Sequence, residues 1–144
     1  MDLTQAEADV LLAMEKVRAD AEVYEFPGAS RAVTIPLVSR DRREEFLLDI
    51  TRGRIDLRKV TYQNRARQIV VLARLDLAGP PHTNPDGVWL ECPHLHLYRE
   101  GYADKWAFAA PAQFANLDDV WLTLEDFMSF CNVADPPQIQ RSII

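Results

Sequence analysis

The chain has 144 residues, of which 48% are hydrophobic and 26% charged. A chain of this length and apolar content usually forms one domain with its own core, so we predict a single domain over residues 1–144. No run approaches the roughly 18 apolar residues that a membrane-spanning helix needs. The N-terminus also lacks the basic-then-apolar pattern of a signal peptide. We therefore expect a cytoplasmic protein with no membrane partner.

The net charge of −6 is unevenly distributed along the chain. Residues 31–74 contain eleven basic side chains against five acidic ones, whereas the segments on either side are acidic. A negative total charge argues against broad non-specific binding of nucleic acid, but the basic middle third permits one localised basic face. The alternative is a set of intramolecular ion pairs with the acidic segments.

A helix is predicted near the N-terminus. Thr4 and Glu7 have the spacing of a capping box, in which each side chain bonds the backbone amide of the other residue. Apolar residues then recur at helical spacing, which predicts an amphipathic helix as far as about Ala19.

Strand patterns fill the middle of the chain. Alternation of apolar and polar residues, or runs rich in β-branched and aromatic residues, predict about six mostly antiparallel strands. Polar residues 39–43 are typical of a hairpin turn, and residues 58–64 could instead begin a helix. Residues 79–87 contain too many turn-forming residues for regular structure. The strand candidates are residues 31–38, 45–51, 54–57, 65–77, 88–91, 94–99 and 105–109.

A second helix is predicted between Asn116, as its N-cap, and about Cys131, because apolar residues recur there at helical spacing. Strands flanked by helices indicate an α+β fold with a mainly antiparallel sheet. We expect both helices to pack on one face of this sheet, leaving the other face free for function.

Histidines dominate the candidate site. Period-two alternation places His94, His96 and Tyr98 on one face of a strand, and Leu95 and Leu97 on the other. The leucines suit the core, so the two histidines and the tyrosine are expected on the open face.

These residue types suit metal-independent cleavage of RNA, which needs a base, an acid and cations around the phosphate. His94, His96 and Tyr98 are the candidate catalytic residues. Aromatic, amide and basic side chains elsewhere could stack on bases and hold phosphates. The candidate substrate-binding residues are Arg54, Tyr62, Arg65, Arg67, His82, Arg99 and Lys105.

A metal site is the second chemical option, since two histidines alternate on one strand and Glu100 follows, as in the first half of a cupin pattern. Cupins need a further distant histidine and a longer barrel. Because fewer than three ligands converge in the sequence, we expect no metal and no cofactor. The two cysteines, Cys92 and Cys131, lie far apart without a CxxC pair, so both are expected to be buried free thiols.

Several blocks of the sequence together resemble an uncharacterised family of small bacterial proteins of unknown function. The most extended block is CPHLHLYREGYADKWA at residues 92–107. The resemblance covers most of the chain and implies a bacterial or mobile-element origin, but it implies no activity and no catalytic residue. The other blocks are RGRIDL (52–57), TYQNRAR (61–67), RLD (74–76) and PHTNPDG (81–87).

Two functions remain open from the sequence. The leading hypothesis is a small bacterial protein directed at nucleic acid, in the form of a ribonuclease of toxin or phage-defence type. The rival is a non-enzymatic interaction module, such as an inhibitor or accessory protein, that uses its acidic helices or basic sheet to bind a protein partner.

Overall fold

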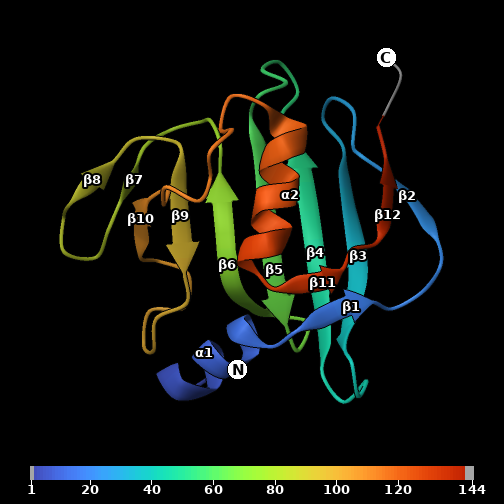
Figure 1. Ribbon diagram of the computed structural model, residues 1–144. Coiled ribbons are helices and arrows are strands. Elements are labelled where there is room, and N and C mark those ends of the chain that lie inside the picture. Colours follow the sequence, from blue (N-terminus) through green and yellow to red (C-terminus); the bar gives the residue numbers. More distant parts are fainter. Residues whose placement is uncertain (1, 142–144) are drawn as a thin grey trace.

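A computed structural model describes residues 2–141 of the chain (Figure 1). Within these residues there are two helices and an eight-stranded, mainly antiparallel sheet, which confirms the α+β class. The main sheet is larger than the expected six strands, and two further sheets of two strands accompany it. The elements are α1 (Gln5–Ala13), β1 (Lys16–Arg18), β2 (Val23–Glu25), β3 (Ala32–Ser39), β4 (Glu45–Arg52), β5 (Val60–Ala66), β6 (Val70–Asp76), β7 (His82–Thr83), β8 (Trp89–Leu90), β9 (His94–Leu97), β10 (Ala107–Ala109), α2 (Val120–Phe130), β11 (Val133–Asp135) and β12 (Gln138–Gln140).

The order of strands across the main sheet is β10-β9-β6-β5-β4-β3-β1-β11. β3 to β6 form a meander of consecutive hairpins, and β9 joins β6 after the small β7–β8 hairpin. At the other end, β1 pairs antiparallel with β3 and parallel with β11. β1 and the edge strand β11 escaped prediction because three residues are too few to show an alternating pattern.

The segment 65–77, predicted as one long strand, is instead the end of β5, a turn and β6. Arg67 and Gln68 in the turn have φ angles of 50° and 69°. Gly or Asn usually marks such left-handed backbone, and neither stands at these positions. Ile69 continues the apolar alternation although it is largely exposed, so the pattern hides the reversal of the chain.

The predicted strand 54–57 is also wrong, because these residues belong to the loop between β4 and β5. Ile55 in this loop is 94% exposed, so this apolar residue does not mark a buried position of a strand. Residues 58–64, which could have begun a helix, lead into β5 and make up most of it.

The capping box of α1 is confirmed, since the Thr4 hydroxyl accepts from the Glu7 amide and the Glu7 carboxylate accepts from the Thr4 amide. The helix ends at Ala13, well before the expected Ala19. The residues after it turn into β1, where the buried Lys16 ammonium bonds to backbone carbonyls at the end of the helix.

The second helix begins at Val120, and its N-cap is Asp119 in place of Asn116. The Asp119 carboxylate accepts from the amides of Trp121 and Leu122 at 2.9 and 3.0 Å, as a capping side chain does. In the described part of the chain, neither helix is long and apolar enough to span a lipid bilayer.

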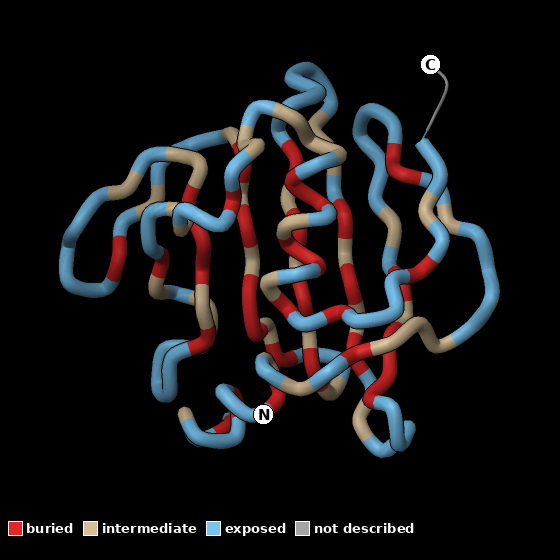
Figure 2. The backbone as a smooth tube through the Cα atoms, viewed as in Figure 1, coloured by how far each residue is buried: buried red, intermediate tan, exposed pale blue. Residues whose placement is uncertain are grey.

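The core lies between α2 and one face of the sheet (Figures 1 and 2). Leu124 and Phe127 of α2 are buried against this face, where Tyr62 is also fully buried. α1 lies at one end of the strands (Figure 1), and its Ala8 and Leu11 join the same core. The prediction that both helices cover one face therefore holds for α2, whereas α1 closes the core at the strand ends.

The opposite face of the sheet carries a row of polar residues. Cross-strand pairing places one residue from each of five adjacent strands in this row, namely Thr34, Asp49, Gln63, Arg74 and His96. Alternation along each strand directs these side chains away from α2.

Candidate functional site

Three histidines meet two charged side chains at one end of the polar face. We call Arg74, Asp76, His82, His94 and His96 the histidine cluster. β6 and β9 pair so that Arg74 lies opposite His96 and Asp76 lies opposite His94. His82, from β7, packs its ring 4.6 Å from that of His96 and 5.9 Å from that of His94, measured between centroids.

Asp76 is the shared partner of two imidazoles. Its Oδ2 atom lies 3.1 Å from Nε2 of His94 and 3.2 Å from Nε2 of His96, and its Oδ1 atom accepts from the Thr61 hydroxyl at 2.9 Å. Burial alone would raise the pKa of this carboxyl group. The contact with His96, the charge of Arg74 and the Thr61 hydroxyl outweigh burial and hold the pKa well below its usual range. Asp76 is therefore ionised.

Arg74 joins the cluster to a second carboxylate. Its Nη1 atom donates to Oδ2 of Asp104 at 2.7 Å, and its Nη2 atom lies 3.0 Å from Nε2 of His96. Its Nε atom is 3.5 Å from Oδ2 of Asp76. With neutral histidines, two carboxylates and one guanidinium leave an excess of one negative charge among these contacting groups.

Backbone carbonyls orient all three imidazole rings. Nδ1 of His96 lies 2.8 Å from the Asp104 carbonyl oxygen, and Nε2 of His82 lies 2.7 Å from that of Lys105. Nδ1 of His94 is 3.3 Å from the Glu91 carbonyl oxygen. Because a carbonyl only accepts, the ring nitrogen that bonds to it carries the hydrogen. An ionised carboxylate also only accepts, so a hydrogen bond from His94 or His96 to Asp76 requires a proton on Nε2 as well. Without that proton, each Nε2 atom offers a lone pair, which a cation placed between it and Asp76 could use.

The cluster is more buried than the sequence predicts. His94 and His96 are only 2% and 1% exposed, so the expectation that they line the open face is wrong. His82 is half-buried and packs against them. The β7–β8 hairpin is held in place by the Asn84 side chain, which bonds to both the amide and the carbonyl of Ala107 on β10.

Tyr98, the third predicted catalytic residue, lies outside the cluster. It follows the end of β9 and enters the core at 7% exposure. Its hydroxyl accepts from the Leu3 amide at 2.8 Å and donates to the Leu3 carbonyl at 2.7 Å. These bonds fix the segment before α1 to the sheet, which is a structural role.

Two predicted substrate-binding residues are already engaged within the protein. Tyr62 is fully buried and its hydroxyl donates to the Val120 carbonyl of α2, so Tyr62 belongs to the core. Arg65 forms two bonds to Asp49, with nitrogen–oxygen distances of 2.6 and 2.7 Å. It remains on the polar face, with its side chain 25% exposed.

The other predicted basic residues are spread over the surface. Arg67 pairs with Glu44 at 3.1 Å, and Arg54 lies exposed in the β4–β5 loop. Lys105 is exposed and reaches the cluster through its backbone carbonyl. Arg99 stacks over the Trp106 ring at 4.4 Å. Of the ten predicted site residues, the structure brings together His82, His94 and His96.

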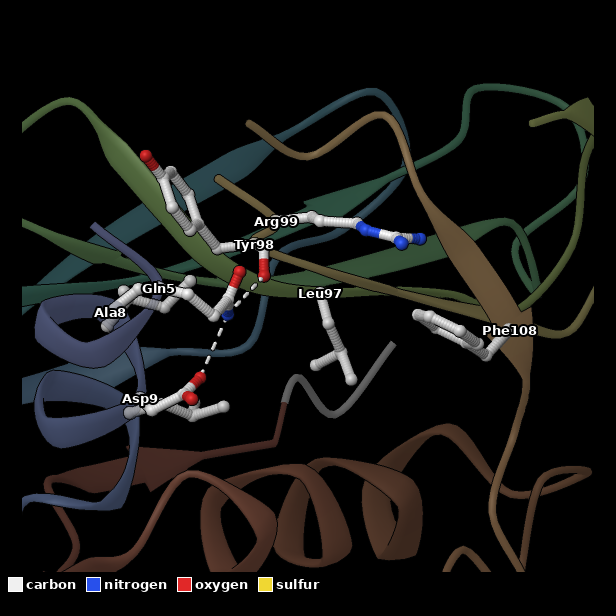
Figure 3. A pocket seen from close by; sticks show the side chains of 9 residues that line it. Gln5, Ala8, Asp9, Leu97, Tyr98, Arg99 and Phe108 are labelled. Carbon is white, nitrogen blue, oxygen red and sulfur yellow. Dashed lines mark hydrogen bonds between the residues drawn. The ribbon is translucent and has the colours of Figure 1, made fainter. Parts of the chain in front are cut away.

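Arg99 also lines a separate hollow of about 360 Å³ between α1 and the β9–β10 edge (Figure 3). Leu97 and Phe108 form its apolar wall, and Gln5 crosses it with bonds to Asp9 and to the Tyr98 carbonyl (Figure 3). Gln5 occupies Asp9 and the Tyr98 carbonyl, and Arg99 stacks on Trp106, so the hollow offers fewer free polar groups than the histidine cluster.

Both cysteines are free, as predicted, but only Cys131 is buried, whereas Cys92 is half-buried. Sγ of Cys92 lies 3.6 Å from Nδ1 of His94. Burial and the nearby negative charges of Asp76 and Glu91 raise the pKa of the Cys92 thiol, which makes it a weak nucleophile at neutral pH. Burial raises the pKa of the Cys131 thiol to about 12.

The expectation of no metal stays a prediction, but its premise that fewer than three ligands converge is wrong. Asp76, His94 and His96 each offer a ligand atom, and these atoms all lie within 4.8 Å of one another. Asp76 lies on β6, eighteen residues before His94, and reaches the histidines only through the pairing of β6 with β9. A signal was present, because Arg74 and Asp76 alternate with Leu75 as His94 and His96 alternate with Leu95.

Neither the search of curated proteins nor the search of solved structures found a match. One family model, described as a family of unknown function (DUF6978), matches residues 3–133. This range contains the histidine cluster and nearly all of the main sheet. The chain therefore belongs to the DUF6978 family.

Proposed function

We propose that the protein acts on RNA and cleaves phosphodiester bonds at the histidine cluster. The observation that carries this proposal is the direct contact among three imidazoles, the Asp76 carboxylate and the Arg74 guanidinium. Imidazoles exchange protons at neutral pH, and a guanidinium stabilises charge on a phosphate. Few other combinations of side chains supply both at one place.

The different exposure of the cluster residues indicates which of them could contact a substrate. His82 is the half-buried histidine of the three, so we assign proton exchange with the substrate to it. Arg74, whose side chain is 27% exposed, contacts the phosphate. Direct proton transfer by His94 or His96 would require the β7–β8 hairpin to move, so we place both residues behind the reacting groups.

The polar face of the sheet provides a surface along which an RNA strand could reach the histidine cluster. Gln63 lies beside Arg74 in the polar row, and Arg65 follows on the same face of β5. Amide and guanidinium groups of this kind bind phosphate and sugar oxygens without selecting a base sequence. The ion pair between Arg65 and Asp49 weakens this attraction and favours a short contact with single-stranded RNA.

Cleavage of labelled single-stranded RNA tests the proposal. His82→Ala is expected to lower the cleavage rate by about two to four orders of magnitude, the usual contribution of a general acid or base. Arg74→Gln is expected to weaken binding and to flatten the dependence of log affinity on log salt by about 0.7. Arg31→Ala, which removes an exposed arginine outside the cluster, is the matched control and should change neither measurement.

Two results would contradict the proposal. One is the absence of RNA binding by the wild-type protein even at about 50 mM salt, where electrostatic contacts are strongest. The other is cleavage that persists unchanged in both the His82 and the Arg74 variants, which would place the reaction elsewhere.

A protein-interaction module is the second candidate, and one observation favours it. Val88 and Trp89 on the β7–β8 hairpin are 52% and 58% exposed, and exposed aromatic residues are enriched at binding surfaces. A photo-crosslinking residue at position 89 should then give a discrete adduct with a partner, whereas the same group at the exposed Gln113 should not. Equal, diffuse labelling at both positions would remove this candidate.

A further inference from the structure

We infer that Asp76, His94 and His96 form a binding site for one divalent transition-metal ion of the Zn²⁺ class. The three side chains come from two adjacent strands, and their ligand atoms converge on one point of the polar face. Imidazole and carboxylate groups are ordinary ligands for such ions.

The separations between ligand atoms fit a single ion. Nitrogen and oxygen ligands lie about 2.0 to 2.2 Å from zinc, so two neighbours on a tetrahedron are about 3.3 Å apart. Oδ2 of Asp76 lies 3.1 Å from Nε2 of His94 and 3.2 Å from Nε2 of His96. All three ligand atoms lie within 4.8 Å of one another, so movement of the imidazoles toward each other would place the three atoms on one ion.

The surrounding contacts orient the ligands as in known metal centres. Metal-binding histidines usually donate their second ring N–H to a carbonyl or carboxylate, which fixes the tautomer and the ring orientation. His96 makes such a contact with the Asp104 carbonyl at 2.8 Å, and His94 faces the Glu91 carbonyl at 3.3 Å. Thr61 likewise holds the carboxylate of Asp76.

Arg74 acts as the competing cation at this site. Its Nη2 atom lies 3.0 Å from Nε2 of His96, the lone pair that the ion would use. Nη1 is separately bonded to Asp104 at 2.7 Å, so Arg74 can withdraw from His96 and keep this ion pair. With neutral histidines, Asp76 and Asp104 together outweigh Arg74 by one negative charge, which favours an added cation, and the ion and Arg74 compete for one nitrogen atom.

The binding of metal stands on this geometry alone, whereas its participation in RNA cleavage rests on the proposed function. An ion here would polarise a phosphoryl oxygen or lower the pKa of a bound water molecule, next to His82 and Arg74. The proposed reaction would then be metal-assisted hydrolysis, and the sequence-based expectation of a metal-independent reaction would be replaced.

Titration of chelator-treated protein with Co²⁺ and Zn²⁺ tests the site. The expected result is about one equivalent of Co²⁺ bound, with a visible absorption spectrum that Zn²⁺ abolishes. Asp76→Asn and His96→Ala are expected to weaken binding at least about 100-fold. His82→Ala removes an adjacent imidazole outside the three ligands and is the matched control, which should retain binding.

Arg74→Gln supplies the sharper test, because it distinguishes a metal site from a cluster that merely needs a positive charge. Removal of the competing guanidinium should tighten metal binding, by about tenfold. Circular dichroism and thermal unfolding establish that each variant is folded, and His96→Gln serves if His96→Ala is not. No binding by the wild-type protein up to about 1 mM metal, or equal binding after Asp76 and His96 are both replaced, would overturn the inference.

The two proposals fail separately. Metal binding without cleavage of RNA would refute the proposed function and leave the metal site standing. Cleavage of RNA by protein that binds no metal would refute the metal site and leave the proposed function standing.

Discussion

Replacement of Lys16 by Met is expected to destabilise the protein more than any surface substitution. Lys16 is fully buried, and its ammonium group donates to three carbonyl oxygens, those of Leu12, Met14 and Cys131, at 2.7 to 2.9 Å. It also lies 4.7 Å from the centre of the Phe46 ring. One side chain thus connects the end of α1, the start of β1 and the C-terminal cap of α2.

The expected loss follows from the groups left behind. Met fills a similar volume but donates no hydrogen bond, so three carbonyl groups lose their donor. A buried polar group without a partner costs about 1 to 3 kcal/mol, and part of this is recovered because Met is easier to bury than an ammonium ion. We therefore expect the free energy of unfolding at pH 7 to fall by about 2 to 5 kcal/mol.

The dependence on pH identifies the cause. Burial lowers the pKa of Lys16 to about 8, from 10.5 in the unfolded chain. Between these values the unfolded chain binds a proton at Lys16 and the folded protein mostly does not, so a rising pH stabilises the folded state. The wild-type protein should gain up to about 3 kcal/mol relative to Lys16→Met across this window. Below about pH 8 both states are protonated and the difference should be constant.

Urea unfolding of both proteins at several values between about pH 7 and pH 10.5 measures this difference. Groups other than Lys16 titrate in both proteins, so their contributions largely cancel. Lys59→Met, which removes an exposed lysine, is the control. Its difference in unfolding free energy from the wild-type protein should not increase with pH. A difference between wild type and Lys16→Met that stays constant up to pH 10.5, or shrinks, would refute the reasoning.

Three further predictions concern the core and the polar face. Tyr98→Phe should lower the free energy of unfolding by about 1 to 3 kcal/mol through loss of its bonds to Leu3, while RNA cleavage by the folded variant is unchanged; a large loss of cleavage would restore the catalytic role. Burial would raise the pKa of Asp49, but hydrogen bonds, the strongest from Arg65, hold it below its usual range. The stability that Asp49 contributes is present above its unfolded pKa and disappears as the pH falls through the folded value. Asp49→Asn should therefore make the free energy of unfolding depend less on pH in acid, and an unchanged dependence on pH would contradict this. Leu124→Ala should cost about 2 to 5 kcal/mol in urea unfolding, and a value near zero would mean that α2 does not cover the sheet.

Local patterns in the sequence were sufficient where structure depends on neighbouring residues. The Thr4 and Glu7 capping box sets the start of α1, because both of its hydrogen bonds span only three residues. Alternation correctly separates Leu95 from His94 and His96, since successive side chains of a strand point to opposite faces. The α+β class follows from such patterns, because each element buries the face that its own periodicity defines.

Local patterns failed at two places for different reasons. The turn at Arg67 and Gln68 joins β5 and β6, which pair immediately on either side of it, but it holds two residues in left-handed backbone without the glycine or asparagine that usually marks such a turn. The early end of α1 depends on a contact distant in sequence, because Lys16 is fixed partly by a carbonyl at Cys131. A window of residues around α1 does not contain this partner.

The candidate site depends on both levels. Residue types and alternation in the sequence named His82, His94 and His96 as candidate site residues. Only the tertiary structure showed that Asp76 lies between two of the imidazoles and that His94 and His96 are buried. The physical reason is the order of the strands, because β9 pairs with β6 and not with the β7–β8 hairpin that precedes it in the chain. Strands pair through backbone groups that are the same in nearly all residues, so the side-chain sequence of a strand does not specify which strand it pairs with.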